Sequence, residues 1–160
     1  MQPTRVLMVC LGNICRSPTA QGVFERLVDA RGLAHVIEVD SAGTSNWHVG
    51  DPPDPRTVRA AGSRGVDLST QRGRQVSASD FKNFDYILAM DSDNLEHLEN
   101  MRPPNYSGHL GLFLDFAPGL VGHSVPDPYH GGQSGFERVL DLCDLAAAGL
   151  LEHIAQHRPS

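Results

Sequence analysis

The apolar and polar positions of the chain form short apolar runs that alternate with stretches of helical periodicity. The runs are partly β-branched and predict four strands, at residues 5–9, 36–41, 84–90 and 109–116. Apolar residues spaced three and four positions apart predict helices over about 18–31, 55–63, 92–101 and 134–157. Strands that alternate with helices indicate a parallel sheet. We therefore expect one α/β domain over residues 1–160, with a four-stranded parallel sheet flanked by helices on both faces.

The segment between the first strand and the first helix predicts an anion-binding loop. Gly12 and Asn13 are residue types that tolerate a positive φ. Ser17 stands where an N-cap would, and Pro18 stands at the first helical position. Such a loop directs several backbone N–H groups at one point, at the positive end of a helix dipole. The alternative is a Gly-rich strand-to-helix turn that carries a buried cysteine.

Cys10 and Arg16 bracket this loop with the spacing Cys-x5-Arg. Backbone amides and a helix N-terminus favour the thiolate form of a cysteine, and the planar fork of an arginine can hold two oxygens of a phosphate. A thiolate below a bound phosphorus can attack it and form a phosphocysteine. The pair therefore predicts covalent phosphoryl transfer, with Cys10 as the nucleophile.

The stretch Cys10-Leu-Gly-Asn-Ile-Cys-Arg-Ser-Pro18 resembles the phosphate loop of the low-molecular-weight protein tyrosine phosphatase family. The similarity runs through nearly the whole chain and includes Asp40-Ser41-Ala42-Gly43, Trp47 and Asp127-Pro128-Tyr129. It implies a flavodoxin-like fold and the hydrolysis of phosphotyrosine and small aryl phosphates through a phosphocysteine. It also implies phosphotyrosine-containing proteins as partners, with a cognate tyrosine kinase as one candidate among them.

Within the loop, backbone amides are expected to hold the three non-bridging oxygens of the phosphate. These amides belong to Leu11, Gly12, Asn13, Ile14, Cys15 and Arg16. Ser17 could also donate to the Cys10 sulfur and stabilise it as a leaving group; the alternative is a capping role alone. Asn13 is expected in a left-handed conformation with its side chain anchored by Ser41, a pairing that the resemblance also implies. Alternatively, Ser41 only satisfies the end of a strand.

The long loop 117–132 carries Asp127, the candidate proton donor to the leaving phenol. Pro128 restricts Asp127 to extended geometry, which helps to aim the carboxyl into a cleft; by itself, Asp-Pro is an ordinary turn. Beside the Cys-x5-Arg motif, and at the family's place in the chain, Asp127 is interpreted as general acid and then general base. Trp47 and Tyr129 are expected to wall a slot for an aryl phosphate, although either ring could pack in the core instead.

The chain has three cysteines, which do not suggest a disulfide framework and favour a reducing compartment. Cys143 lies on the apolar stripe of the last helix and is expected in the core. Cys15 is expected to be the redox partner of Cys10: once peroxide converts Cys10 to a sulfenic acid, Cys15 can condense with it. The alternative is that Cys15 is a small buried filler beneath the loop.

Four other functions compete with this interpretation. An arsenate reductase shares the Cys-x5-Arg loop but needs two further cysteines, and none stands between Cys15 and Cys143. Protein-arginine phosphatases of the same family tend to carry Thr where Ile14 stands and Phe where Tyr129 stands. A phosphate-binding module without turnover would not need a nucleophile, an arginine and an acid together. A zinc site is disfavoured because a thiolate loop closed by arginine repels a cation.

Composition and residue spacing argue against several other classes of protein. The net charge of −6 argues against a nucleic-acid binder. No segment has the length of a membrane span or of the apolar region of a signal peptide. The eight histidines show no metal-ligand spacing, and no cofactor is expected. We expect a cytoplasmic monomer, while export without a signal stays open. His130 stands where some relatives carry a second tyrosine, so regulatory phosphorylation at that second position is in doubt.

Overall fold

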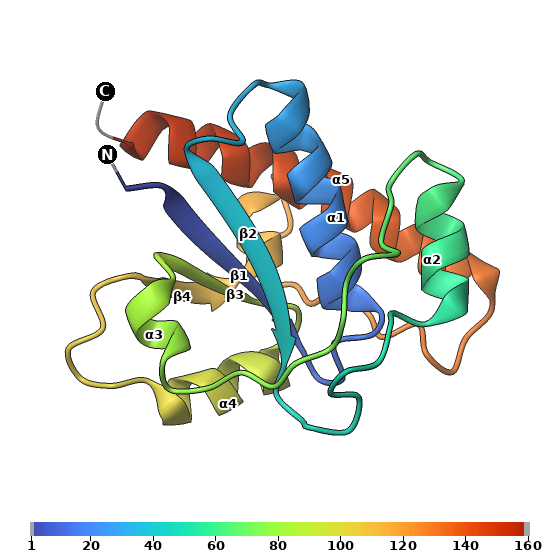
Figure 1. Ribbon diagram of the computed structural model, residues 1–160, viewed down its shortest axis with the longest axis horizontal. Helices are drawn as coiled ribbons and strands as arrows, with labels where there is room; N and C mark the ends of the chain where they lie inside the picture. Colours follow the sequence, from blue (N-terminus) through green and yellow to red (C-terminus); the bar gives the residue numbers. More distant parts are fainter. Residues whose placement is uncertain (1, 159–160) are drawn as a thin grey trace.

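The computed structural model describes residues 2–158. Its centre is a sheet of four parallel strands in the order β2-β1-β3-β4 (Figure 1). The strands are β1 Thr4–Cys10, β2 Ile37–Gly43, β3 Tyr86–Ala89 and β4 His109–Leu112. The predicted four-stranded parallel sheet is therefore confirmed.

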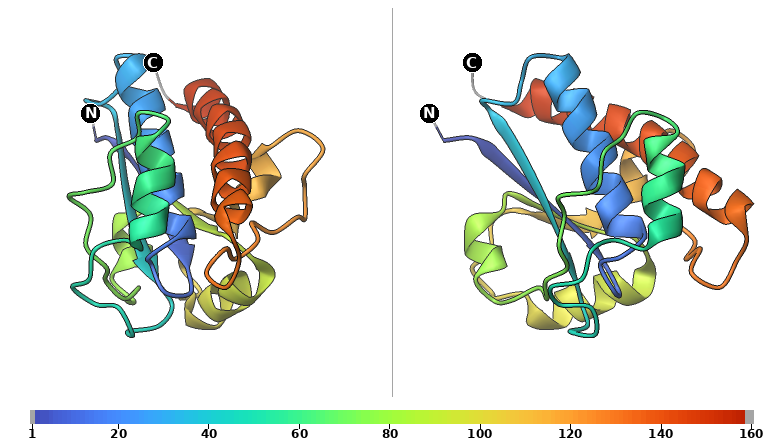
Figure 2. Two further views of the ribbon diagram at one scale, coloured as in Figure 1. Left: turned by 90° about the vertical axis from the view of Figure 1, so that its right-hand side faces the viewer. Right: turned by 45° about the vertical axis from the view of Figure 1, so that its right-hand side comes forward.

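Helices cover both faces of this sheet, as predicted (Figure 2). They are α1 Arg16–Ala30, α2 Pro55–Gly62, α3 Asp80–Asn83, α4 Ser92–Met101 and α5 Gln133–His157. Helices α1, α2 and α5 share one core, in which α5 contacts both α1 and α2, whereas α3 and α4 belong to the core on the other face. Within the residues that the structure describes, no helix is long and apolar enough to cross a membrane.

Strand β1 is the central element, since it lies between β2 and β3. Its side chains alternate between the two cores: Val6 and Met8 pack with α1 and α5, whereas Leu7 and Val9 pack with α4. All four side chains are 0% exposed. Burial on both faces explains why the strand has a continuous apolar sequence rather than an alternating one.

The first helix begins earlier than predicted. Helix α1 starts at Arg16, and Cys15 occupies the N-cap position without a side-chain cap hydrogen bond. The interpretation of Ser17 as the N-cap and of Pro18 as the first helical residue is therefore wrong. The Ser17 hydroxyl lies against the Cys10 sulfur instead, so it is not available to cap the helix.

Two elements on either side of β3 also differ from the sequence pattern. The alternating run 109–116 predicts one strand, but β4 ends at Leu112 and a 3-10 helix, η1 Phe113–Phe116, follows. Phe113 and Leu114 are buried in the core shared with α5, and this packing overrides the strand-like alternation. The four-residue helix α3 was not predicted, because it is too short to show a helical period.

The carboxyl ends of β1 and its two neighbours meet at one edge of the sheet. The chain leaves β1 towards β2 on one side, whereas β3 pairs with its other side. Open α/β sheets bind ligands at such a switch point, beyond the carboxyl ends of the strands. Cys10 is the last residue of β1 and lies at this point.

Candidate active site

Asn13 holds the curve of the loop between β1 and α1. Its φ is 58°, and it is the one non-glycine residue with a positive φ within residues 2–158. Its amide nitrogen donates to Ser41 Oγ at 3.0 Å and to Ser17 Oγ at 2.9 Å, and its side-chain oxygen accepts from the Arg74 backbone N–H at 3.1 Å. Ser41 donates in turn to Gln21 at 2.7 Å. These contacts fix a backbone conformation that most side chains avoid.

The Cys10 sulfur lies at the centre of this loop, and Cys10 as a whole is only 3% exposed. The Ser17 hydroxyl lies 3.0 Å from the sulfur, and the Asn13 backbone N–H donates to it at 3.3 Å. The N-terminus of α1 begins directly behind the loop. Donors and a helix N-terminus directed at one sulfur favour a negative charge there.

Arg16 is buried beside the sulfur and is held by fixed partners. One terminal nitrogen donates to Asp91 Oδ2 at 2.5 Å and to the Val125 carbonyl at 3.1 Å. The other lies 3.7 Å from Asp127 Oδ2. Burial opposes the charge of the guanidinium, but Cys10 and the two carboxylates outweigh burial and raise the pKa of Arg16. Arg16 therefore stays cationic, and its planar fork is locked in one orientation.

Asp91 is a site residue that the sequence reasoning missed. Asp91 is the N-cap of α4, where its Oδ1 accepts from the Asn94 backbone N–H at 2.7 Å. Its other oxygen binds Arg16. Its position in the chain could have indicated this role: Asp91 follows β3, and the carboxyl ends of parallel strands meet at the edge of the sheet where ligands bind.

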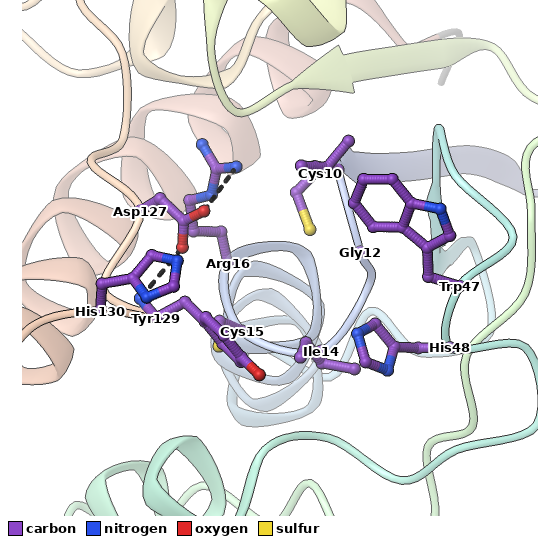
Figure 3. Close-up of a pocket in the computed structure, with 11 residues that line it drawn as sticks. Cys10, Gly12, Ile14, Cys15, Arg16, Trp47, His48, Asp127, Tyr129 and His130 are labelled. Carbon is purple, nitrogen blue, oxygen red and sulfur yellow. Dashed lines mark hydrogen bonds and ion pairs between the residues drawn. The ribbon is translucent and has the colours of Figure 1, made fainter.

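Asp127 reaches the same site from the loop before α5. Its side chain is 48% exposed, and its Oδ2 faces Arg16. Its Oδ1 accepts from the Tyr129 backbone N–H at 3.1 Å. In Figure 3, Asp127 lies across the opening from the Cys10 sulfur. The carboxyl is therefore placed where it can meet both solvent and a bound ester.

These residues surround a cleft of about 270 Å³. Trp47 stands on one side of it, while Tyr129 and His130 stand on the other (Figure 3). Trp47 is 70% exposed and Tyr129 42% exposed, so neither ring packs in the core. The loop after β1 also lines the cleft, with Leu11, Gly12, Ile14 and Cys15. The cleft thus joins Cys10 and Arg16 to aromatic walls.

His48 also lines the cleft, and no sequence signal marked it. It lies so close to the loop that a Cβ on Gly12 would meet its ring carbon at 3.3 Å. Its Nδ1 pairs with Asp51 at 3.1 Å. A lone histidine in a polar loop has no periodicity or motif by which it could be recognised.

The second loop cysteine, Cys15, is buried next to the cleft. Burial raises the pKa of the Cys15 thiol to about 12, although the neighbouring Thr57 side chain acts in the opposite direction. Cys143 is fully buried in the core of α5, as predicted, and burial raises its pKa as well. Residues 2–158 contain no group of three or more His, Cys, Asp or Glu side chains placed to hold a metal ion.

Known proteins resemble this chain along nearly its whole length. The family model described as "Low molecular weight phosphotyrosine protein phosphatase" matches residues 5–160. A fission yeast (Schizosaccharomyces pombe) protein of the same description is 47% identical over 133 residues, which cover 82% of this chain and 85% of that protein.

Two solved structures bear on the substrate. A protein tyrosine phosphatase from Entamoeba histolytica superposes with a TM-score of 0.92 at 39% identity, covering 98% of this chain and 99% of that one. A Drosophila arginine phosphatase superposes with a TM-score of 0.86 at 35% identity, covering 92% and 96%. The fold is thus common to proteins named for two different substrates.

Proposed function

Since the chain belongs to the low molecular weight protein tyrosine phosphatase family, a family of hydrolases, we propose that it hydrolyses phosphotyrosine and small aryl phosphates through a phosphocysteine on Cys10. The observation that carries this proposal is the convergence of three groups on one cleft. The Cys10 sulfur, the buried Arg16 guanidinium and the Asp127 carboxyl all line it.

In the first step, the Cys10 thiolate attacks phosphorus and the bond between phosphorus and the phenol oxygen breaks. Asp127, in its protonated form, gives its proton to that leaving oxygen. Arg16 and the loop amides bind the three equatorial oxygens, on which charge concentrates in the transition state. Ser17, 3.0 Å from the sulfur, stabilises its negative charge.

In the second step, Asp127 works in the opposite sense. Its carboxylate takes a proton from a water molecule as that water attacks the phosphocysteine. The bond between sulfur and phosphorus breaks, which releases inorganic phosphate and restores the Cys10 thiolate. The half-exposed position of Asp127 supports this role, because water can reach the carboxyl.

The walls of the cleft favour an aryl ester over other phosphate donors. A phenyl ring can stack between Trp47 and Tyr129 while its phosphate reaches the loop. The arginine-specific relatives tend to carry Thr and Phe at the places of Ile14 and Tyr129. Both residues therefore support tyrosine as the substrate. We further propose that the protein acts as a cytoplasmic monomer on phosphotyrosine-containing proteins, one of which is a candidate cognate kinase.

Replacement of the nucleophile tests this function. Cys10→Ser should abolish hydrolysis of p-nitrophenyl phosphate and yet still bind vanadate, because the loop amides and Arg16 remain. Residual turnover within tenfold of the parent would exclude a thiolate mechanism. Used as bait on a lysate of the source cell, the same variant should retain phosphotyrosine proteins and release them when vanadate is added.

A further inference from the structure

One arginine of α2 contacts the loop that carries Asp127. The Arg56 guanidinium donates to the Tyr129 carbonyl at 2.9 Å. It also lies over two rings, at 5.5 Å from the centroid of Tyr129 and 4.8 Å from that of Phe136. A cation over the faces of two rings and bonded to a backbone carbonyl restrains that loop at several points.

Arg56 is itself held rigidly by Asp54. Its Nε donates to Asp54 Oδ1 at 3.1 Å and its Nη2 donates to Oδ2 at 2.9 Å. This bidentate contact lowers the pKa of Asp54, whose side chain is only 8% exposed. Asp54 also caps α2 by accepting from the Arg56 backbone N–H at 2.8 Å. The guanidinium is therefore fixed relative to the start of α2.

Asp54 also connects α2 to the loop between β1 and α1, residues 11–15, which follows Cys10 and is called the nucleophile loop below. The Asp54 backbone N–H donates to the Ile14 carbonyl at 2.9 Å. One continuous set of contacts thus runs from Ile14 through Asp54 and Arg56 to Tyr129. It joins the loop that carries Cys10 to the loop that carries Asp127.

Tyr129 transmits this restraint to the acid. Its carbonyl accepts from Arg56, while its backbone N–H donates to Asp127 Oδ1 at 3.1 Å. The Asp127 side chain is about half exposed, so core packing does little to fix it. Gly131 and Gly132 follow in the same loop and add no side chain that could restrain the loop. The orientation of the carboxyl therefore depends on the Tyr129 backbone.

We propose that Arg56 is a positioning residue for the general acid: it holds the Tyr129 backbone so that Asp127 meets the leaving oxygen of a bound ester. This inference rests on the proposed phosphatase function. Arg56 acts through Asp127 and does not touch the phosphate. Its loss should therefore weaken proton donation in the first step, which kcat/KM reports, as well as proton removal from water in the second step.

The leaving group separates this role from a structural one. Phenol is a poor leaving group and needs the proton of the acid, whereas p-nitrophenol leaves well without it. We expect Arg56→Ala to lower kcat/KM, which reports the first step, on phenyl phosphate by about tenfold or more, a part of the 10²–10⁴ that a general acid contributes. On p-nitrophenyl phosphate the loss should stay below about threefold, and vanadate affinity should match the parent. Arg59→Ala, at an exposed arginine of the same helix, is the matched control.

A double-mutant cycle with Asp127→Asn gives the decisive measurement. If Arg56 acts through the acid, adding Arg56→Ala to Asp127→Asn should change kcat/KM on phenyl phosphate by less than about twofold. Arg56→Lys should restore little, because an ammonium cannot bind Asp54 and the Tyr129 carbonyl with one planar fork. This variant keeps the charge and the aliphatic stem, so it still tests the proposal if the alanine variant unfolds.

Equal losses on both esters, or an unchanged loss in the Asp127→Asn background, would overturn the positioning role while leaving the phosphatase function intact. Parent protein without turnover on either ester would instead reject the proposed function, and the positioning role with it.

Discussion

Arg16 illustrates how single residues divide the work of this site. We propose that its charge serves phosphate binding, whereas its orientation comes from Asp91, which lies beyond β3. Removal of Asp91 would leave a buried cation without its closest partner, at a cost of a few kcal/mol. The reactive groups therefore depend on neighbours that the Cys-x5-Arg motif does not contain.

The role of Asp127 predicts a leaving-group dependence. Asp127→Asn should lower turnover by about 10²–10⁴, the range for a lost general acid. The loss should be larger for phosphotyrosine, whose phenol has a pKa near ~10, than for p-nitrophenyl phosphate. Steady-state kinetics on both esters measures it. A uniform loss would assign proton donation to another group.

Cys15 predicts reversible inactivation by peroxide. The parent should regain activity with thiol after a peroxide pulse, whereas Cys15→Ser should start active but recover poorly, because Cys10 then oxidises irreversibly. The pKa of Cys15, raised to about 12, means that its thiolate is scarce at neutral pH. Disulfide formation should therefore accelerate about tenfold for each pH unit above 7, in proportion to the thiolate.

Mass spectrometry of the oxidised protein provides the check on this redox prediction. It should find Cys10 joined to Cys15 and leave Cys143 reduced, since Cys143 is 0% exposed in the core. A bond from Cys10 to Cys143, or equal recovery of the parent and Cys15→Ser, would contradict the prediction. Bound phosphate should protect the parent by covering Cys10.

At the scale of helices and strands, the sequence predicted those element ends that depend on interactions between neighbouring residues. The bounds of α2 and the end of α1 agree with the predicted ranges to within one residue, because the cap by Asp54 and the φ of 70° at Gly32 involve residues next to these helix ends. The end of β4 was not predicted, because it depends on Phe113, which packs in the core shared with α5, a helix that begins about twenty residues later in the chain. The contact between Arg56 and Tyr129 joins residues 73 positions apart, and no local pattern indicates it.

The end of β2 predicts a steric requirement at Gly43. A Cβ there would lie 2.8 Å from the Leu11 carbonyl and 3.2 Å from the backbone of Gly12, so the nucleophile loop would have to move. We expect Gly43→Ala to lower kcat/KM by about tenfold to hundredfold, the scale of a displacement near 1 Å. Kinetics on p-nitrophenyl phosphate measures it.

Gly62 offers the matched control on α2. A Cβ at Gly62 meets nothing within 4 Å, and the residue is helical. Gly62→Ala should keep full activity and stabilise the fold by about 0.5–1 kcal/mol. Equal activity of the two alanine variants would show that the loop tolerates the Gly43 side chain.

For the molecule as a whole, a cluster of histidines that links stability to pH lies away from the active-site cleft. The cleft lies at the carboxyl edge of the sheet, while His109, His153 and His157 gather with Tyr86 and Phe116 between β4, η1 and α5. Burial lowers the pKa of His109, although Asp115 counteracts it. Burial, with repulsion from the other two histidines, lowers the pKa of His153.

These two pKa values predict how stability changes with pH. An unfolded histidine has a pKa near 6.5 and gains a proton before its folded counterpart does. Above that pH both states are neutral and stability is complete; as pH falls through about 6.5 towards the lower folded pKa values, the unfolded state binds more protons and the fold loses stability. Each kcal/mol lost should lower Tm by about 2–4 °C in a chain of this size.

Thermal unfolding between pH 8 and pH 5 measures this effect, and a variant without the two titrating rings isolates it. His109→Phe with His153→Phe keeps aromatic packing against Tyr86 and Phe116 but removes both protonation sites. Its Tm should stay flatter than that of the parent across this window. Burial raises the pKa of Glu25 and of Asp144, but both carboxylates are present in the parent and in the variant, so their effect cancels in the comparison. Parallel Tm curves for parent and variant would mean that this histidine cluster titrates alike in the folded and unfolded states.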